Sequence, residues 1–318
     1  MSHCTIIAGP CSVDEQNVKE IIEISQMTIT NNKGKTQRAI AGTRIVGLKS
    51  RTELSFNGTG MGMDYDALQQ NVHIMINGGS GRDMIVTPSA LIAEEIQKKT
   101  GMIIATEIMM PSVQLPSYEN RIPAGRLMPW NPSVNQLGWQ IMETALFSSR
   151  NGWHIGIKNG KWIGEDTGVT TMEKTWAGLS SYAKKGTGDV ILIHRGVDVP
   201  GKGMYRNMPV HTIAGRTKKM TGAKLYFDPS HSYGPKLKHQ IVEATVDAMN
   251  MRLDDGSHLY DGVLIEAGTS KTDTEQHISL QELETLVKLI AKTRILVAPD
   301  EIKTSPRNSR DYISSGVL

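Results

Sequence analysis

The chain has few of the features that mark secreted or membrane-bound proteins. Its 318 residues include only two cysteines, Cys4 and Cys11. They lie too close together in the sequence to form a useful disulfide, and a reducing compartment would keep both as thiols. No apolar run reaches the roughly 18 residues of a membrane span, and the N-terminus has no basic region followed by a signal-peptide core. We therefore expect a cytoplasmic protein.

An excess of charge of one sign is also missing. The formal net charge at pH 7 is +3, and the lysines and arginines are spread along the chain. We therefore expect no nucleic-acid partner and no membrane surface, and any anion site must be local. Hydrophobic residues make up 39% of the chain and charged residues 21%, which is typical of a globular protein with a sizeable core.

What the chain does have is an alternation of strand-like and helix-like segments. Several strand-like segments are continuous apolar runs, as expected of strands buried on both faces. The predicted strands are 5–9, 43–49, 102–108, 126–130, 153–158, 189–195, 223–228 and 260–267. The predicted helices include 14–30 with Ser12 as its cap, 88–99, 133–149, 170–184, 235–250 and 279–293. This order indicates an α/β protein built as a single (β/α)8 TIM barrel, with a doubly wound open sheet as the alternative fold.

Two segments do not fit the alternation. Residues 57–87 are longer than a simple connection and glycine-rich at both ends, so we expect an insertion or lid. Residues 300–318 are polar and are expected to form a loosely packed tail. The whole chain, 1–318, is thus predicted to be one barrel domain with its core at about 4–295.

Four metal-competent side chains follow different predicted strands. Cys11 follows the first strand, His231 follows the seventh, and Glu266 ends the eighth, with Asp273 shortly after it. The carboxyl ends of TIM-barrel strands surround the active site, so we expect these side chains on one rim. Each alone has a simpler explanation, because a buried Cys or His is more often a packing residue and a lone carboxylate can cap a loop. Together, such mixed soft and hard donors suit one divalent ion such as Mn, Fe, Co or Zn rather than Ca or Mg.

A second group of strand-end residues is cationic. Exposed Lys and Arg usually indicate only a solvated surface, but these residues terminate apolar strands whose ends should lie in the barrel mouth. Arg pairs with phosphate or carboxylate in a bidentate manner and Lys acts as a point charge, so the group predicts a multiply anionic substrate. Its members are Arg44, Lys49 and Arg51, followed by Thr52, at the second strand, Lys158 at the fifth and Arg195 at the sixth.

Eight motifs, in this order, resemble those of 3-deoxy-D-arabino-heptulosonate-7-phosphate (DAHP) synthases. They are "AGPCS", "LKSRTELSFNGTG", "ATEIM", "GIKNG", "IHRG", "DPSHS", "DGVLIE" and "TDTEQ". The resemblance covers nearly the whole chain, from residue 5 to about 293. The related 3-deoxy-D-manno-octulosonate-8-phosphate synthases share much of this frame. The element "KSRT" followed by "SFNG" looks like the "KPRT" and "F-x-G" element of the heptulosonate branch, which favours erythrose 4-phosphate over arabinose 5-phosphate as acceptor.

The resemblance implies a metal-dependent transferase that forms a C–C bond. Such an enzyme condenses phosphoenolpyruvate with erythrose 4-phosphate and releases phosphate, the first step of the shikimate pathway and of aromatic amino acid biosynthesis. The resemblance also implies a homo-oligomer, a dimer or a tetramer, whose metal is manganese or another divalent ion.

The resemblance further assigns roles to single residues. Cys11, His231, Glu266 and Asp273 are the implied metal ligands. Arg44, Lys158 and Arg195 are implied to hold phosphoenolpyruvate, and Lys49, Arg51 and Thr52 to receive the aldose phosphate. Lys158, Glu107 and Lys49 are the implied catalytic residues: Glu107 positions the attacking water, and Lys158 donates a proton or stabilises charge at the enolpyruvyl end.

The sequence departs from the family pattern at Ser50, where the family usually has Pro, and at the position of a phosphate-binding Arg. After the fourth strand these synthases carry a "GAR" element whose Arg grips the phosphate of phosphoenolpyruvate, but here the stretch reads "RLMPWNPSVNQLG". Asn131 takes the place of that Arg, and losing one such contact costs on the order of 1.5 to 3 kcal/mol of binding. Arg126 or Arg121 is a candidate substitute. His194, beside Arg195, is expected to be a packing residue.

Two other functions are compatible with these residues. A divergent family member would condense phosphoenolpyruvate, or a similar enolpyruvyl donor, with another aldose or aldose phosphate such as arabinose 5-phosphate. A non-catalytic barrel would serve only in binding or regulation, but such a protein has no physical reason to keep four metal-competent side chains.

Overall fold

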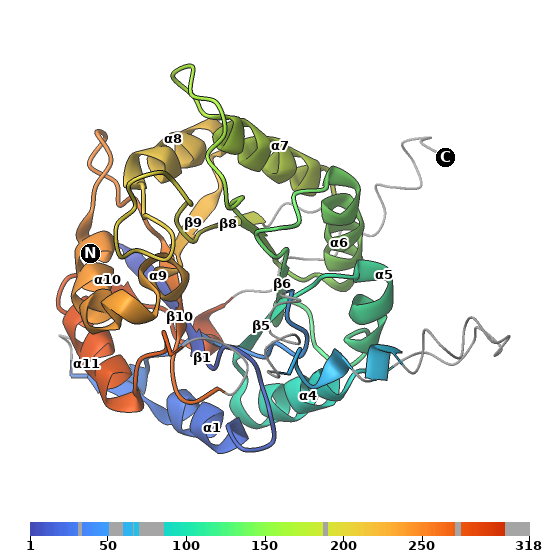
Figure 1. Ribbon diagram of the computed structural model, residues 1–318. Coiled ribbons are helices and arrows are strands. Elements are labelled where there is room, and N and C mark those ends of the chain that lie inside the picture. The colour runs from blue at the N-terminus through green and yellow to red at the C-terminus, as the bar shows by residue number, and fades with distance from the viewer. Residues whose placement is uncertain are drawn as a thin grey trace, which may run out of the picture.

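Eight parallel strands close into a barrel at the centre of the molecule (Figure 1). The computed structural model describes residues 1–30, 34–50, 60–65, 67–69, 86–186, 190–270 and 275–302. Each barrel strand pairs with the next one along the chain, and β10 pairs back with β1. The barrel strands are β1 His3–Gly9, β4 Gly42–Arg44, β5 Ile103–Glu107, β6 Leu127–Trp130, β7 Ile155–Lys158, β8 Val190–His194, β9 Lys224–Phe227 and β10 Gly262–Glu266. The predicted TIM barrel is confirmed, and closure excludes the open sheet.

Burial on both faces explains why the strands are continuous apolar runs. Successive side chains of a strand point to opposite faces. Ile6 and Leu192 belong to the layer between barrel and helices, whereas Ile7 and Trp130 belong to a separate apolar cluster inside the barrel. Gly156 makes room for Trp130, because a Cβ at Gly156 would lie only 2.9 Å from the Trp130 Cβ.

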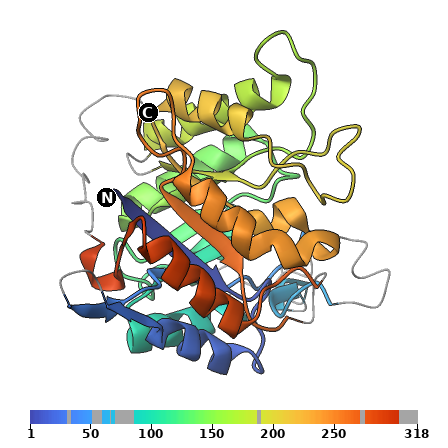
Figure 2. The same cartoon turned by 90° about the vertical axis from the view of Figure 1, so that its left-hand side faces the viewer.

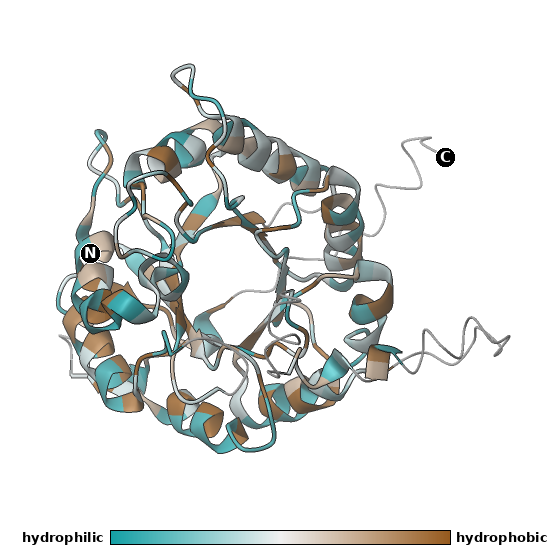
Figure 3. Ribbon diagram, viewed as in Figure 1, coloured by the Kyte–Doolittle hydropathy of each residue, from teal (hydrophilic) through white to brown (hydrophobic). Residues whose placement is uncertain are grey.

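Amphipathic helices cover the outside of the barrel. In α11 the apolar residues between Leu283 and Ile290 are buried at helical spacing, and Ser279 and Glu282 form a capping box at its start. Helices α10 and α11 lie side by side (Figure 2), and the outer helices carry both hydrophobic and hydrophilic residues (Figure 3). The long helices are α1 Val18–Gln26, α4 Pro88–Thr100, α6 Gly138–Asn151, α7 Thr171–Gly186, α8 His211–Thr221, α10 Ile241–Asn250 and α11 Leu280–Ala291.

Short elements occupy the connections. They include the helices α5 Pro111–Gln114 and α9 Pro229–Tyr233 and the 3-10 helices η1 Leu115–Ser117, η2 Pro235–Gln240 and η3 Pro299–Glu301. Strands β2 Thr28–Thr30 and β3 Thr36–Arg38 form an antiparallel pair, and β11 Ile295–Leu296 pairs with the beginning of β1.

The first predicted helix is wrong at both ends. It was expected over 14–30 with Ser12 as its cap, but α1 begins at Val18 with Asn17 as the N-cap residue and ends at Gln26. The Asp14 carboxylate accepts the backbone N–H groups of Gln16 and Asn17, which forms a turn before the helix. The β-branched residues at 28–30 extend and pair with β3 instead of continuing the helix.

Helix α8 was not predicted. Its buried face consists of Ile213, Ala214, Gly215 and Thr217, so it offers one large apolar side chain where a typical amphipathic helix has several. The predicted insertion at 57–87 and the tail at 300–318 fall largely outside the described residues. Within the described part of the chain, no helix is long and apolar enough to cross a membrane.

Candidate active site

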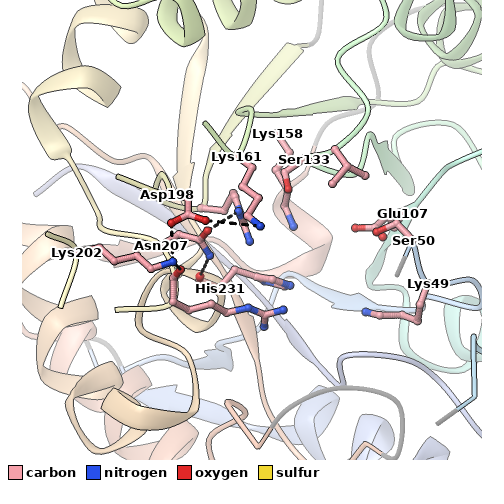
Figure 4. Close-up of a pocket in the computed structure, with 13 residues that line it drawn as sticks. Lys49, Ser50, Glu107, Ser133, Lys158, Lys161, Asp198, Lys202, Asn207 and His231 are labelled. Carbon is pink, nitrogen blue, oxygen red and sulfur yellow. Dashed lines mark hydrogen bonds and ion pairs between the residues drawn. The ribbon is translucent and has the colours of Figure 1, made fainter. Parts of the chain in front are cut away.

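Polar side chains gather where the barrel strands end. Parallel strands all finish at the same edge of the barrel, so the residues that end them or directly follow them meet there. These buried residues are Arg44, Glu107, Asn131, Lys158, Arg195, Asp228 and Glu266. A pocket of about 420 Å³ opens at this edge, and Glu107, Lys158 and Arg195 line it. Figure 4 shows Glu107 and Lys158 in the pocket.

Arg44 and Glu266 form a buried ion pair between β4 and β10. Arg44 Nη2 lies 2.9 Å from Glu266 Oε1, and the side chains are 1% and 0% exposed. Burial opposes the Arg44 cation, but the negative charges of Glu266 and Asp228 outweigh it and raise the pKa of Arg44. Among the described residues, Arg44 Nη1 has no hydrogen-bond partner. Since none of the described residues accepts a hydrogen bond from Nη1, this nitrogen could donate to a ligand.

A second buried group of contacts, an ion pair and a hydrogen bond, joins Lys158, Asp228 and His231. Lys158 Nζ lies 3.1 Å from Asp228 Oδ2, and His231 Nδ1 lies 3.0 Å from Asp228 Oδ1. Burial opposes the charge of Asp228, but the hydrogen bond from His231 and the cations of Lys158 and Arg44 outweigh it and hold the pKa of Asp228 well below its usual range. Burial also lowers the pKa of His231. His231 is therefore neutral at pH 7, and the proton on Nδ1 is donated to Asp228.

His231 and Glu266 are arranged like two ligands of one metal ion. His231 Nε2 lies 3.6 Å from Glu266 Oε1. Because Asp228 accepts the proton on Nδ1, Nε2 presents its lone pair, as in carboxylate–histidine–metal sites. Gln276 Nε2 donates to Glu266 Oε2 at 2.6 Å and fixes the carboxylate. Among the described residues no group of three or more His, Cys, Asp or Glu is placed to hold a metal ion.

Cys11 reaches the same edge, but its thiol contacts Lys49. Lys49 Nζ lies 2.8 Å from Cys11 Sγ and 3.2 Å from the Cys11 carbonyl oxygen, and both residues are buried. An ammonium group at this distance stabilises a thiolate, the form that binds metal. On sequence alone these two residues were expected in different subsites, and the structure brings them together.

Trp130 forms an aromatic wall of the site that was not predicted from the sequence. Its indole Nε1 donates to Glu107 Oε2 at 3.3 Å. The charged groups of Arg44 and Lys158 lie 5.5 and 5.6 Å from its ring centroid, within cation–π range. The sequence contained one indication of this role, because Trp130 is the last residue of a predicted apolar strand and therefore lies at the edge where the strands end.

Asn131 connects two strand ends. Its Oδ1 accepts the backbone N–H of Lys158 at 2.9 Å, and its Nδ2 donates to the carbonyl oxygens of Asn135 and Lys158 at 2.9 and 3.2 Å. Asn159 does the same one strand further on, accepting the Arg195 N–H and donating to the Gly196 carbonyl. These amides fix the backbone that presents Lys158 and Arg195, so Asn131 is a structural residue here.

The two candidate substitutes for the missing Arg lie elsewhere, which corrects the sequence-based hypothesis. Arg126 precedes β6, at the opposite end of the strand from the site, and its Nη1 donates to the Pro299 carbonyl at 2.6 Å. Arg121 Nε pairs with Glu94 of α4 at 3.5 Å. Neither side chain lines the pocket. Arg51, Thr52 and Asp273 lie outside the described residues.

His194 is a packing residue, as predicted. It is fully buried on the helix side of β8, and its Nδ1 lies 2.7 Å from the Tyr260 hydroxyl. His211 Nδ1 contacts the same hydroxyl at 2.7 Å.

Comparison with solved structures identifies the same architecture in two forms of one enzyme. The chain superimposes on phospho-2-dehydro-3-deoxyheptonate aldolase (DAHP synthase) from Thermotoga maritima with a TM-score of 0.65 and 18% identity, covering 92% of this chain and 69% of that one. A truncated form of 3-deoxy-D-arabino-heptulosonate 7-phosphate synthase from the same organism gives a TM-score of 0.62 and 16% identity, covering 92% and 86%. This chain has their fold. No protein-family model and no curated protein matches the sequence.

Proposed function

We propose that the chain is a metal-dependent synthase that condenses phosphoenolpyruvate with erythrose 4-phosphate, giving DAHP and phosphate. The observation that carries the proposal is the pairing of two features on one barrel edge. His231 and Glu266 face each other as metal ligands would, and Lys49, Lys158 and Arg195 line the adjoining pocket. A fold shared with a DAHP synthase supports the same assignment.

The described donors fit a divalent transition ion. His231 Nε2 and Glu266 Oε1 would hold it, with Cys11 and Asp273 as the further ligands that the sequence resemblance implies. A bound ion would act as a Lewis acid toward the aldehyde oxygen of the acceptor. Asp228 orients His231, and Gln276 together with Arg44 orients Glu266, so the two donors are positioned before an ion arrives.

The cations of the pocket would hold the donor. Lys158 and Arg195 would bind the phosphate and carboxylate of phosphoenolpyruvate, with Arg44 Nη1 as a buried donor nearby. Clustering these cations offsets the repulsion between two anionic substrates and brings C3 of the enolpyruvyl group to the aldehyde carbon.

The remaining steps fall to Lys158 and Glu107. Attack by C3 forms the new C–C bond and leaves positive charge at C2. Glu107, held by the Trp130 indole, would orient the water that adds at C2. Lys158 would supply a proton as the C2–O bond to phosphate breaks. This order accounts for release of the phosphate by C–O cleavage.

The contacts of Asn131 favour one alternative to the proposed reaction, a condensation of the same type with a different substrate. Its amide forms hydrogen bonds with backbone groups, so it does not replace the Arg that binds the donor phosphate in the family. An enolpyruvyl donor other than phosphoenolpyruvate, or an acceptor such as arabinose 5-phosphate, is the second candidate.

The test is phosphate release from phosphoenolpyruvate with Mn²⁺ present, using erythrose 4-phosphate, arabinose 5-phosphate or unphosphorylated aldoses as acceptors. We expect release that depends on erythrose 4-phosphate. Release with arabinose 5-phosphate alone would favour the alternative acceptor. No release with any acceptor would refute the proposed reaction and favour an enolpyruvyl donor other than phosphoenolpyruvate.

A further inference from the structure

Asn207 joins two parts of the proposed site, and it was not predicted from the sequence. It lies in the loop that follows β8, its side chain is buried, and it lines the pocket. The amide oxygen Oδ1 accepts from Arg195 Nη1 at 2.8 Å, and the amide nitrogen Nδ2 donates to the His231 carbonyl at 2.6 Å. Figure 4 shows the contact with His231. One buried amide therefore links the end of β8 to a proposed metal ligand.

Backbone contacts hold Asn207 itself in place. Its N–H donates to the Ser232 carbonyl at 2.9 Å, and the next residue, Met208, exchanges two backbone hydrogen bonds with Val197 at 2.7 and 3.0 Å. Gly196 permits this close approach, because a Cβ there would lie 2.3 Å from the Asn207 carbonyl oxygen. The amide is thus fixed in position before any ligand binds.

The partner of Arg195 differs in charge from the partners of the other buried cations. Arg44 pairs with Glu266, and Lys158 pairs with Asp228. Each carboxylate offsets much of the charge of its cation. The hydrogen bond from Arg195 Nη1 goes instead to an amide, which is neutral. This contact orients the guanidinium without neutralising it.

We propose that Asn207 is a positioning residue that aims the Arg195 guanidinium at an anionic group of the donor and leaves its charge available to that group. The inference rests on the proposed function, because it takes Arg195 to bind phosphoenolpyruvate. A carboxylate at position 207 would accept the same hydrogen bond, but it would compete with the donor for the guanidinium. The neutrality of the amide, and not only its shape, is therefore what the site requires.

Two substitutions separate charge from orientation at this position. Asn207→Asp keeps the shape and an acceptor for Arg195 but adds a negative charge, whereas Asn207→Leu is neutral and removes the acceptor. Both variants lose the donation to the His231 carbonyl, so the difference between them reports on Arg195. Asn250→Asp is the matched control, because Asn250 is an exposed residue of α10 that does not line the pocket.

Calorimetry measures the binding of phosphoenolpyruvate and of inorganic phosphate to each protein. We expect Asn207→Leu to bind both anions about tenfold more weakly than the wild type, because the guanidinium loses its orientation. Asn207→Asp should bind them about a hundredfold more weakly or worse, because its carboxylate pairs with Arg195 and repels the anion. Asn250→Asp should bind them as the wild type does.

Urea unfolding establishes that each variant is folded. Asn207→Ser, which is neutral and too short to reach Arg195, replaces Asn207→Leu if the leucine variant does not fold. If the aspartate variant does not fold, a neutral variant that binds both anions as tightly as the wild type still overturns the inference.

The outcomes separate this inference from the proposed function. Equal affinities of Asn207→Asp and Asn207→Leu, or an aspartate variant closer to the wild type, would overturn the inference, as would a wild type that binds neither anion. The expected order in a protein that releases no phosphate from phosphoenolpyruvate would uphold the role of Asn207 and refute the proposed reaction. Turnover with the same Michaelis constant for phosphoenolpyruvate in the wild type and Asn207→Asp would uphold the reaction and refute the role.

Discussion

Lys158 Nζ lies 3.1 Å from Asp228 Oδ2, and the two side chains are 2% and 0% exposed. The pair connects the end of β7 to the residue that caps α9. Through Asp228 the lysine is linked to His231, so the proposed proton donor and a proposed metal ligand share one buried carboxylate.

Replacing Lys158 with Met should abolish turnover and destabilise the fold. The change leaves Asp228 with one fewer compensating cation, and breaking a buried ion pair costs about 3 kcal/mol. Urea unfolding measures the loss. The double variant Lys158→Met with Asp228→Asn should recover part of it, because no uncompensated charge remains. A Lys158→Met protein as stable as the wild type would contradict this role of the pair.

Acidification should destabilise the protein through His211. Burial lowers the pKa of His211 to about 4 from its usual 6.5. The unfolded chain takes up the proton below pH 6.5 while the folded chain does not, so stability is full above that pH and is lost as the pH falls toward 4. The expected loss is up to about 3 kcal/mol. His194 acts in the same direction, because burial also lowers its pKa.

Urea unfolding at pH 7, 6 and 5 checks the effect of His211. His211→Gln should flatten the decline in the free energy of unfolding, since Gln cannot be protonated in this range. An unchanged slope in the variant would show that His211 does not cause the decline.

Removing a proposed metal ligand should abolish activity without unfolding the barrel. His231→Ala and Cys11→Ala should each lose bound metal and phosphate release, while circular dichroism stays that of the wild type. Metal content by mass spectrometry is the direct readout. Full activity in a chelated, metal-free sample would refute the metal-dependent reaction.

Replacing Arg126 with Ala should leave the Michaelis constant for phosphoenolpyruvate unchanged. Arg126 donates to the Pro299 carbonyl at the far end of β6, so its loss should cost only about 1 kcal/mol of stability. Steady-state kinetics and urea unfolding measure the two effects. A raised Michaelis constant with unchanged stability would mean that Arg126 reaches the donor.

The sequence predicted the barrel because its eight strands are buried on both faces and read as apolar runs. It also predicted that Lys158, Arg195 and Glu266 lie together, since residues at the ends of parallel strands share one edge. Arg126 stood at the start of its predicted strand, and the same rule would have placed it at the other end of the barrel.

Other parts of the site could not be predicted from the spacing of apolar residues in the sequence. Lys202 and Asn207 lie in the loop after β8, whose path depends on contacts such as the one between Lys202 and Asp198. The contact between Cys11 and Lys49 joins segments after β1 and β4, which are neighbours in the barrel but distant in the sequence. Helix α8 lacked the large apolar residues that mark an amphipathic helix.

The most direct test of the proposed reaction follows the carbon that forms the new bond. Phosphoenolpyruvate labelled with ¹³C at C3 is incubated with the protein, Mn²⁺ and erythrose 4-phosphate, and the products are examined by NMR. We predict that the label appears in the C3 methylene of a seven-carbon 3-deoxy sugar phosphate, in step with phosphate release. Label found only in pyruvate, or left in phosphoenolpyruvate, would contradict the proposal.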